Sequence, residues 1–325
     1  MERIAALLIA CTLAAAPAGA QTPAPAPVAA TPDTTPAGDD LAFAVLDERM
    51  TVPVAIAGAG PYQFIVDTGA QRSVVSRQLA KRLGLPIGRR VRLTAMSGSS
   101  DVDTVIIPSL SVSTPPVVGI GGERIEAPAL EAQHLGAPGM LGIDTLQGHA
   151  VVIDFDRQAM TVTPSTKRDR RRRAAPDEIV IQAKNLFGQL VVTDAFVLGQ
   201  RVRVILDTGT PVSVGNSALR RLVARRKVEA TPAVFTSVLG GEVVADYVIL
   251  PEMKLGDATV TSLPIAFSDV PPFRAFGVDD KPAILLGMDA LKLFRRVHID
   301  FANRQLRLAM PRTALRRDGV RFGPS

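Results

Sequence analysis

The two halves of this chain repeat one another, and this repeat constrains the fold more than any other feature of the sequence. The segment Phe64-Ile65-Val66-Asp67-Thr68-Gly69 matches Val204-Ile205-Leu206-Asp207-Thr208-Gly209. Further segments match in the same order: residues 107–108 with 250–251, residues 140–144 with 285–289, and residues 153–155 with 299–301. Because chance similarity would not preserve the order, the sequence predicts two homologous lobes that arose by internal duplication.

Composition predicts where these lobes begin and end. Residues 21–40 consist almost entirely of Pro, Ala, Thr and Asp, which is typical of a disordered spacer. The net charge of +6 is concentrated in a basic linker, residues 165–175, and a basic tail, residues 312–325. We expect one lobe on each side of the linker, over residues 41–164 and residues 176–311. Both basic segments are interpreted as exposed and flexible; the alternative, contact with nucleic acid or an anionic envelope, lacks an RNA-binding aromatic signature.

The N-terminus has the pattern of a secretory signal peptide. A short charged start precedes an apolar run over residues 4–16, and Ala18-Gly19-Ala20 supplies a small-residue cleavage site. We therefore expect residues 1–20 to be removed after Ala20 and the protein to be secreted or periplasmic. The apolar run is too short for a permanent membrane span. Cys11, the only cysteine, lies inside this segment, so after cleavage the mature protein would have no thiol for disulfides or catalysis. Attachment of a lipid at Cys11, as in a bacterial lipoprotein, is the alternative.

The pattern within each half is mostly β. Hydrophobic residues make up 47% of the chain and aromatic residues only 4%, so Val, Leu, Ile and Ala must build the cores. Short apolar runs such as residues 52–56, bounded by Gly and Pro, predict strands joined by tight turns. A short helix is expected after each Asp-Thr-Gly, capped by Ser76 or Asn216. A second helix in each half is expected to begin at Asp144 or Asp289 as the N-cap residue.

The two Asp-Thr-Gly segments supply the candidate catalytic pair, Asp67 and Asp207. Peptide hydrolysis without a metal or a thiol needs a base to activate water and an acid for the carbonyl oxygen, and two neighbouring carboxyls can supply both. Two negative charges so close cannot both form cheaply, so one proton is shared and the two pKa values separate. These pKa values belong to the pair rather than to either residue.

These paired motifs resemble those of the pepsin and retropepsin clan of aspartic proteases. In that family a Ser or Thr follows the Asp-Thr-Gly within a few positions, and here Ser73 and Ser213 follow it. The family's later apolar-apolar-Gly element matches residues 140–142 and 285–287. The resemblance implies an all-β, bilobal acid-protease fold, with two retropepsin-like β-barrel lobes, short helices and a cleft between them. A single chain would then act as an intramolecular pseudo-dimer, which favours a monomer.

Residues around the catalytic pair are expected to hold it in place. Gly69 and Gly209 let the backbone turn sharply and bring N–H groups near the carboxylates. The hydroxyls of Thr68 and Thr208 are expected to hydrogen-bond across to the opposite lobe's loop and so fix the separation of the aspartates, a role that the family implies as well. The serines that follow each motif are expected to support the outer carboxylate oxygens.

The family also closes hairpin flaps over its substrate. The candidates lie between each Asp-Thr-Gly and the matched proline, at residues 94–99 and residues 236–241. The tip residues expected to contact substrate are Met96, Ser97, Gly98, Leu239, Gly240 and Gly241. Both halves keep a Gly-containing tip without the flap tyrosine of pepsin-like enzymes, and this favours the retropepsin type.

The remaining polar residues predict no metal and no cofactor. His134, His149 and His298 lack the spacing of a metal site, and there is no Gly-rich phosphate loop. Asp154 and Asp300 lie in late strands and are expected to be structural.

Together these features predict an aspartic endopeptidase that cleaves a peptide or protein substrate with water activated by Asp67 and Asp207. The alternative is a catalytically inactive peptide-binding protein that kept the scaffold. A third possibility is that the lobes pair between chains.

Overall fold

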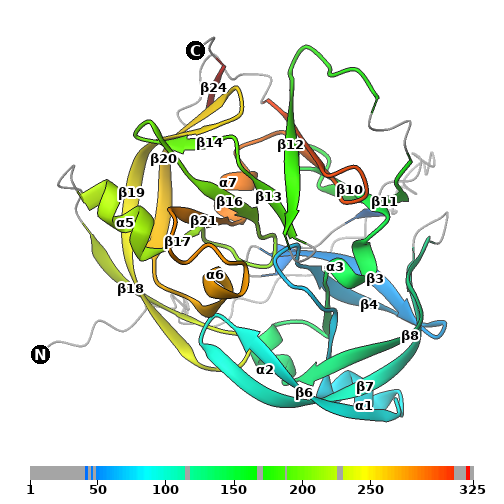
Figure 1. The fold of residues 1–325 in the computed structure, drawn as a ribbon. Helices are drawn as coiled ribbons and strands as arrows, with labels where there is room; N and C mark the ends of the chain where they lie inside the picture. The colour runs from blue at the N-terminus through cyan, green and yellow to red at the C-terminus, as the bar shows by residue number, and fades with distance from the viewer. Residues whose placement is uncertain are drawn as a thin grey trace, which may run out of the picture. The chain divides into compact units, whose positions relative to one another are not determined.

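The computed structural model describes residues 41–42, 45–46, 49–113, 118–166, 171–186, 189–224, 230–310 and 320–322. The expected signal peptide with Cys11, and the spacer of residues 21–40, lie outside the described residues. Strands predominate over short helices, which confirms the predicted all-β fold class (Figure 1). No helix within the described ranges is long and apolar enough to cross a membrane.

The first lobe is built on an eight-stranded sheet. In pairing order its strands are β2 (Val45–Leu46), β3 (Arg49–Ile56), β4 (Ala59–Val66), β9 (Gly139–Leu141), β5 (Val74–Ser76), β8 (Val118–Leu130), β7 (Gly98–Val112) and β6 (Ile87–Ala95). An additional pairing of β3 with β7 joins the strands between them into a ring. This closure produces the β-barrel that the resemblance implied for this lobe.

The second lobe repeats the arrangement. In pairing order its strands are β12 (Glu178–Leu186), β13 (Gln189–Val192), β16 (Arg203–Leu206), β21 (Ala283–Leu286), β17 (Val214–Gly215), β20 (Ala258–Phe267), β19 (Glu242–Leu255), β14 (Ala195–Val197) and β15 (Gln200–Arg201), with β18 (Thr231–Thr236) on β19 and β24 (Val320–Phe322) on β20. In both lobes the strand before Asp-Thr-Gly runs parallel to the strand of the apolar-apolar-Gly element, which places Val66 opposite Leu141 and Leu206 opposite Leu286. The duplication therefore extends from sequence to topology.

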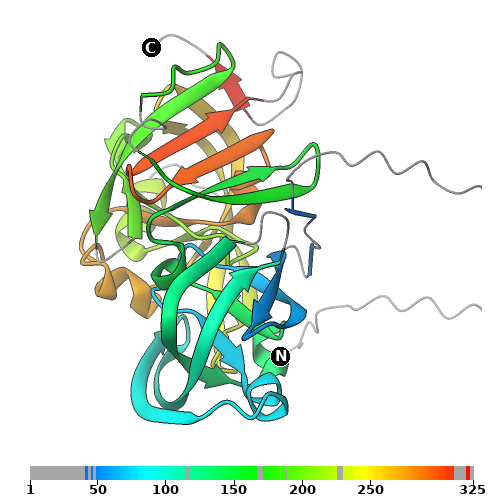
Figure 2. The ribbon, with the colours of Figure 1, turned by 90° about the vertical axis from the view of Figure 1, so that its right-hand side faces the viewer.

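One run of antiparallel strands joins the two lobes. β10 (His149–Asp154) of the first half pairs with β22 (Arg296–Asp300) of the second. β11 (Ala159–Pro164) and β1 (Leu41–Ala42) continue the sheet on one side, and β23 (Gln305–Ala309) and β12 continue it on the other. Figure 2 shows the green and orange-red strands of this sheet side by side. The lobes thus share continuous backbone hydrogen bonding.

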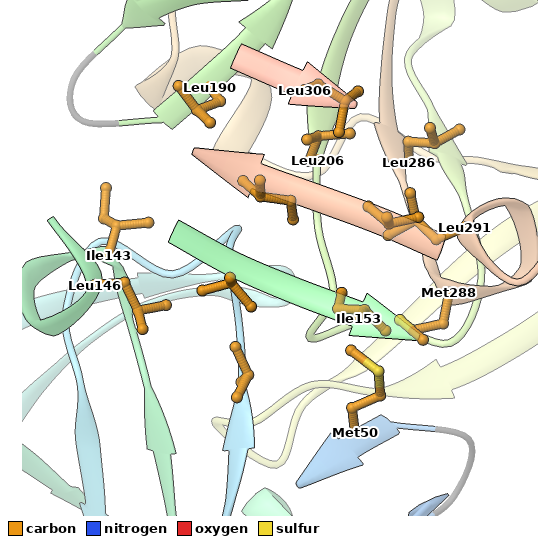
Figure 3. Close-up of a cluster of buried hydrophobic side chains, with 14 of the residues drawn as sticks. Met50, Ile143, Leu146, Ile153, Leu190, Leu206, Leu286, Met288, Leu291 and Leu306 are labelled. Carbon is orange, nitrogen blue, oxygen red and sulfur yellow. The ribbon is translucent and has the colours of Figure 1, made fainter. Parts of the chain in front are cut away.

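A single apolar core runs through this junction. Ile143, Leu146 and Ile153 come from the first half, and Met288 and Leu291 come from the second, and all are almost fully buried in one cluster (Figure 3). Burial of apolar surface is the main favourable term in folding. The two lobes are therefore expected to unfold together.

The short helices begin close to where the sequence predicted. Ser76 caps α1 (Arg77–Arg82), and Asn216 caps α5 (Ser217–Ala224): each side chain accepts a hydrogen bond from the N–H three residues on, at 3.1 and 3.0 Å. These predictions are confirmed. In contrast, α3 (Ile143–Leu146) and α7 (Met288–Leu291) have Gly142 and Gly287 as N-caps, two residues before the expected N-caps. Asp144 and Asp289 are therefore not N-cap residues.

The basic linker is more firmly held than predicted. Arg172 pairs with Glu178, which also accepts a hydrogen bond from Arg307 at 3.2 Å. The Arg307 side chain is only 2% exposed, and it also donates to the backbone carbonyl of Arg172 at 2.7 Å. A buried guanidinium needs such acceptors, so it anchors the linker to β12 and β23. Residues 167–170 of the linker lie outside the described residues.

Two further expectations concern the late strands and the tail. Asp154 accepts a hydrogen bond from Arg296 at 2.7 Å, and Asp300 accepts one from Ser165 at 2.6 Å, in keeping with structural roles.

Within the tail, expected to be flexible, β24 pairs with β20. Sheet hydrogen bonds that join strands far apart in the chain carry little local sequence signal, so the expectation missed this strand.

Candidate active site

The two Asp-Thr-Gly segments leave equivalent strands in the same way. Asp67 follows β4 and its backbone N–H donates to the carbonyl of Leu141 at 2.9 Å. Asp207 follows β16 and its N–H donates to the carbonyl of Leu286 at 3.0 Å. Each aspartate is therefore fixed at the end of a buried parallel strand pair.

Each carboxyl lies against the glycine of the opposite lobe. A Cβ atom added to Gly69 would lie 2.6 Å from Cγ of Asp207, and one added to Gly209 would lie 2.2 Å from Cγ of Asp67. Only glycine leaves room for the carboxyl at either position. The structure thus brings together the four residues that the sequence placed in the two loops.

The two carboxyls have unlike surroundings. Burial raises the pKa of Asp207 well above its usual range, and the charge of Asp67 and a hydrogen bond with that carboxyl add to the shift. Backbone N–H groups of Gly209 and Thr210 oppose it. Oδ1 of Asp67, which is less deeply buried, accepts two backbone N–H groups at 2.8 and 2.9 Å. Asp207 accepts equivalent backbone donors, so its deeper burial is the difference between the two carboxyls, and this difference favours ionised Asp67 and protonated Asp207.

The two threonines lock the loops together across the lobes. The hydroxyl of Thr68 donates to the carbonyl of Leu206 at 2.9 Å, and the hydroxyl of Thr208 donates to that of Val66 at 2.7 Å. Each hydroxyl also accepts the backbone N–H of the other threonine, at 3.1 and 3.2 Å. Both side chains are buried. The reciprocal hydrogen bonds fix the spacing of the neighbouring aspartates.

Removing either hydroxyl should weaken both the fold and the site. Thr68→Val or Thr208→Val keeps the shape of the side chain but leaves buried backbone groups unpaired, at a cost of about 1–3 kcal/mol each. We expect that loss in urea unfolding, together with a lower kcat/KM. Thr68→Ser and Thr208→Ser keep the hydroxyl and serve as controls. A valine variant as stable and active as wild type would contradict this role.

Ser73 and Ser213 bond differently from the expectation. Their hydroxyls donate to Asp144 at 2.7 Å and to Asp289 at 2.6 Å, rather than to the aspartates of the pair. Their backbone N–H groups donate to the same carboxylates, at 2.8 and 3.0 Å. Each helix aspartate also accepts the backbone N–H of the next residue in its own helix, Thr145 or Ala290, at 2.9 and 2.7 Å, so its carboxylate joins the start of the helix to the loop. Burial raises the pKa of Asp144, and the donors on Ser73 oppose that shift.

Asp144 and Asp289 therefore anchor the loops that carry Ser73 and Ser213, whereas the sequence predicted that they cap helices. Backbone hydrogen bonds add to this anchoring. The N–H of Ile143 donates to the carbonyl of Ala70 at 3.0 Å, and the N–H of Met288 donates to the carbonyl of Thr210 at 3.0 Å. The signal available in the sequence was the recurrence of an aspartate two residues after Leu-Gly in both halves.

Both candidate flaps are hairpin tips. β6 and β7 are joined at Met96 and Ser97, and β18 and β19 are joined by residues 237–241. Gly98 and Gly240 have φ values of 138° and 84°, which only glycine adopts readily. Figure 1 shows the yellow β18–β19 hairpin reaching toward α2 (Ala132–Leu135) of the first lobe.

The tips reach the opposite lobes and touch each other. Met96 packs against an apolar cluster of the second lobe, and Leu239 packs against one of the first lobe. A Cβ added to Gly241 would lie 2.7 Å from Oγ of Ser97. Contact of the flap residues with substrate remains a prediction.

Comparison with known proteins gives one family. The sequence profile described as Aspartyl protease matches residues 52–145 and residues 193–290. One matched segment falls in each lobe, and each includes one Asp-Thr-Gly and one apolar-apolar-Gly element. A search of curated proteins found no match.

Proposed function

Because this chain belongs to the aspartyl protease family, we propose that it is an aspartic endopeptidase whose catalytic pair is Asp67 and Asp207. One observation carries the proposal: each carboxyl lies against the loop of the other lobe, and reciprocal threonine hydrogen bonds hold the loops together. Two neighbouring carboxyls with unlike surroundings suit paired acid and base roles.

In the proposed reaction the two carboxyls divide the proton transfers. Ionised Asp67 takes a proton from water, whose oxygen attacks the carbonyl carbon of the scissile peptide bond. Protonated Asp207 gives its proton to the carbonyl oxygen. As the tetrahedral intermediate breaks its C–N bond, Asp67 passes the proton it took from water to the leaving nitrogen. Asp207 takes a proton back from one hydroxyl of the intermediate, whose carbon becomes the new carboxyl group. No covalent link between enzyme and substrate is needed.

The proposed substrate is an extended peptide lying between the lobes and the two flaps. Extended peptides are recognised through backbone hydrogen bonds, with side chains held in pockets on alternate sides. The N-terminal sequence pattern supports export of the enzyme to the periplasm or beyond.

A peptide-library digest from acid to neutral pH tests the function. We expect a bell-shaped pH profile. Activity should fall at high pH as the shared proton, held by the raised pKa of Asp207, is lost, and at low pH as Asp67 is protonated. A statine-type peptide should inhibit cleavage. If this peptide binds but no bond is cut at any pH, the inactive peptide-binding alternative is favoured instead.

A further inference from the structure

The interlobe sheet, formed by β10, β22, β23 and β12, has one apolar face and one polar face. Val297 and Ile299 of β22 are buried in the core, so His298 between them lies on the opposite, polar face. In the register of the sheet, His298 lies directly opposite Arg307 of β23. The Cβ atoms of directly opposite residues lie about 5 Å apart, so the imidazole and the guanidinium are neighbours.

Both ends of the basic linker are bound to neighbours of His298. The hydroxyl of Ser165 donates to Asp300, two residues after His298 on the same face, at 2.6 Å. At the other end, the backbone carbonyl of Arg172 accepts a hydrogen bond from Arg307 at 2.7 Å. The linker is therefore attached to the sheet next to the imidazole.

Glu178 completes the attachment of the second end. Its carboxylate accepts hydrogen bonds from the backbone N–H of Ala175 and from Arg307, each at 3.2 Å. It also pairs with Arg172. One buried guanidinium and one carboxylate thus hold residues 171–175, which we call the strap, against the sheet.

His298 is poorly placed to carry a proton while the strap is attached. Its Nε2 atom is buried and has no hydrogen-bond partner among the described residues, so a proton there would have no acceptor. Burial lowers the pKa of His298. The carboxylates of Asp300 and Glu178 oppose this shift, whereas the charges of Arg172 and Arg307 add to it.

The neighbours of His298 on the β10 side do not change this balance. The residue directly opposite it on β10 is Val152, which has no charge. Arg296, two residues earlier on β22, is paired with Asp154 of β10. Apart from Asp300, the charges that act on the ring therefore come from the strap, β23 and β12.

We propose that protonation of His298 releases the strap from the interlobe sheet, so that residues 171–175 leave the sheet as the pH falls. Release exposes the ring to water, which hydrates its charge and gives the proton on Nε2 an acceptor. The released state therefore binds the proton more tightly than the attached state, and acid favours release. The change is expected below about pH 6.5, the ordinary pKa of histidine. Release needs neither carboxyl of the catalytic pair.

Protonation of Glu178 is the other way in which acid could loosen the strap. Burial raises the pKa of Glu178, but the hydrogen bonds and charges of Arg172, Ala175 and Arg307 outweigh burial and leave the pKa below its usual value. Glu178 therefore stays ionised over the range in which histidine gains a proton. Release between about pH 7 and pH 5 thus indicates His298 as the sensor.

Hydrogen exchange of the Ala175 amide measures release directly, because this N–H donates to Glu178 while the strap is attached. After correction for the intrinsic effect of pH on exchange, protection in the wild type should fall by roughly 5- to 100-fold from about pH 8 to about pH 5, as for one buried group left without a partner. His298→Gln stays neutral and should keep the amide protected throughout. His298→Lys carries a charge throughout and should lose this protection already at about pH 8. His134→Gln, in α2 of the first lobe, is the matched control and should respond as wild type does.

Three results would overturn the proposal. The first is constant protection of Ala175 in the wild type over this pH range, and the second is an equal loss in His298→Gln, since another group would then be the sensor. The third is loss of protection at the amides of β10 and β22 together with Ala175, because the whole interlobe sheet would then be opening. If neither His298 variant folds, the NMR signals of the His298 ring and the exchange of Ala175 should change with the same midpoint in the wild type, and different midpoints would contradict the coupling.

Discussion

Asp67→Asn and Asp207→Asn should each lower peptide cleavage by about 10²- to 10⁴-fold, the usual contribution of a positioned acid or base. An amide keeps the shape of the carboxyl but cannot take a proton from water or donate the shared one. The measurement is kcat/KM on a peptide found in the library digest. Asp257→Asn, in the exposed turn between β19 and β20, is the matched control and should retain full activity. Cleavage at wild-type rates by either pair variant would refute the assignment.

The same substitution at Asp207 should change how stability depends on pH. The folded protein raises the pKa of Asp207, so it binds this proton more tightly than the unfolded chain does. The resulting stabilisation is present below the usual carboxyl pKa and is lost as the pH rises through the raised value. Asparagine carries no charge at any of these pH values. Urea unfolding should therefore show that the free energy of unfolding of Asp207→Asn, relative to that of wild type, increases from acid to neutral pH.

The fold and the pair could be predicted because their signals are local and repeated. Asp67 and Asp207 each follow an apolar strand, and the recurrence of the whole motif order indicates two equivalent lobes. Ser76 and Asn216 cap helices through contacts three residues away, which a sequence pattern can capture.

The partners that the sequence did not predict depend on the path of the chain in space. Ser73 donates to Asp144 from 71 residues away in the chain, so its partner is set by how the loop and the start of α3 meet in space. Arg172 and Arg307 meet on Glu178 only because β12 pairs with β23. Side chains of these types are mostly exposed in folded proteins, so composition alone favours the solvated interpretation.

Gly209→Ala should lower activity by about 10²-fold or more, because it displaces the carboxyl of Asp67, the proposed base. The added Cβ would lie 2.2 Å from Cγ of Asp67, and the corresponding atom of Gly69→Ala would lie 2.6 Å from Cγ of Asp207. A shift of about 1 Å in a reacting group can cost this much in rate. Gly119→Ala is the matched control, since its Cβ would meet nothing within 4 Å. Full activity of Gly209→Ala would contradict the close approach of the loops.

The remaining activity of the glycine variants tests whether the carboxyls share a proton. The separation between the two pKa values of the pair comes from the interaction between its members. A methyl group that pushes the carboxyls apart weakens this interaction, so the lower pKa rises and the upper one falls. The pH–rate profile of Gly69→Ala or Gly209→Ala should therefore be narrower than that of wild type, whereas general loosening of the fold would lower the profile without narrowing it.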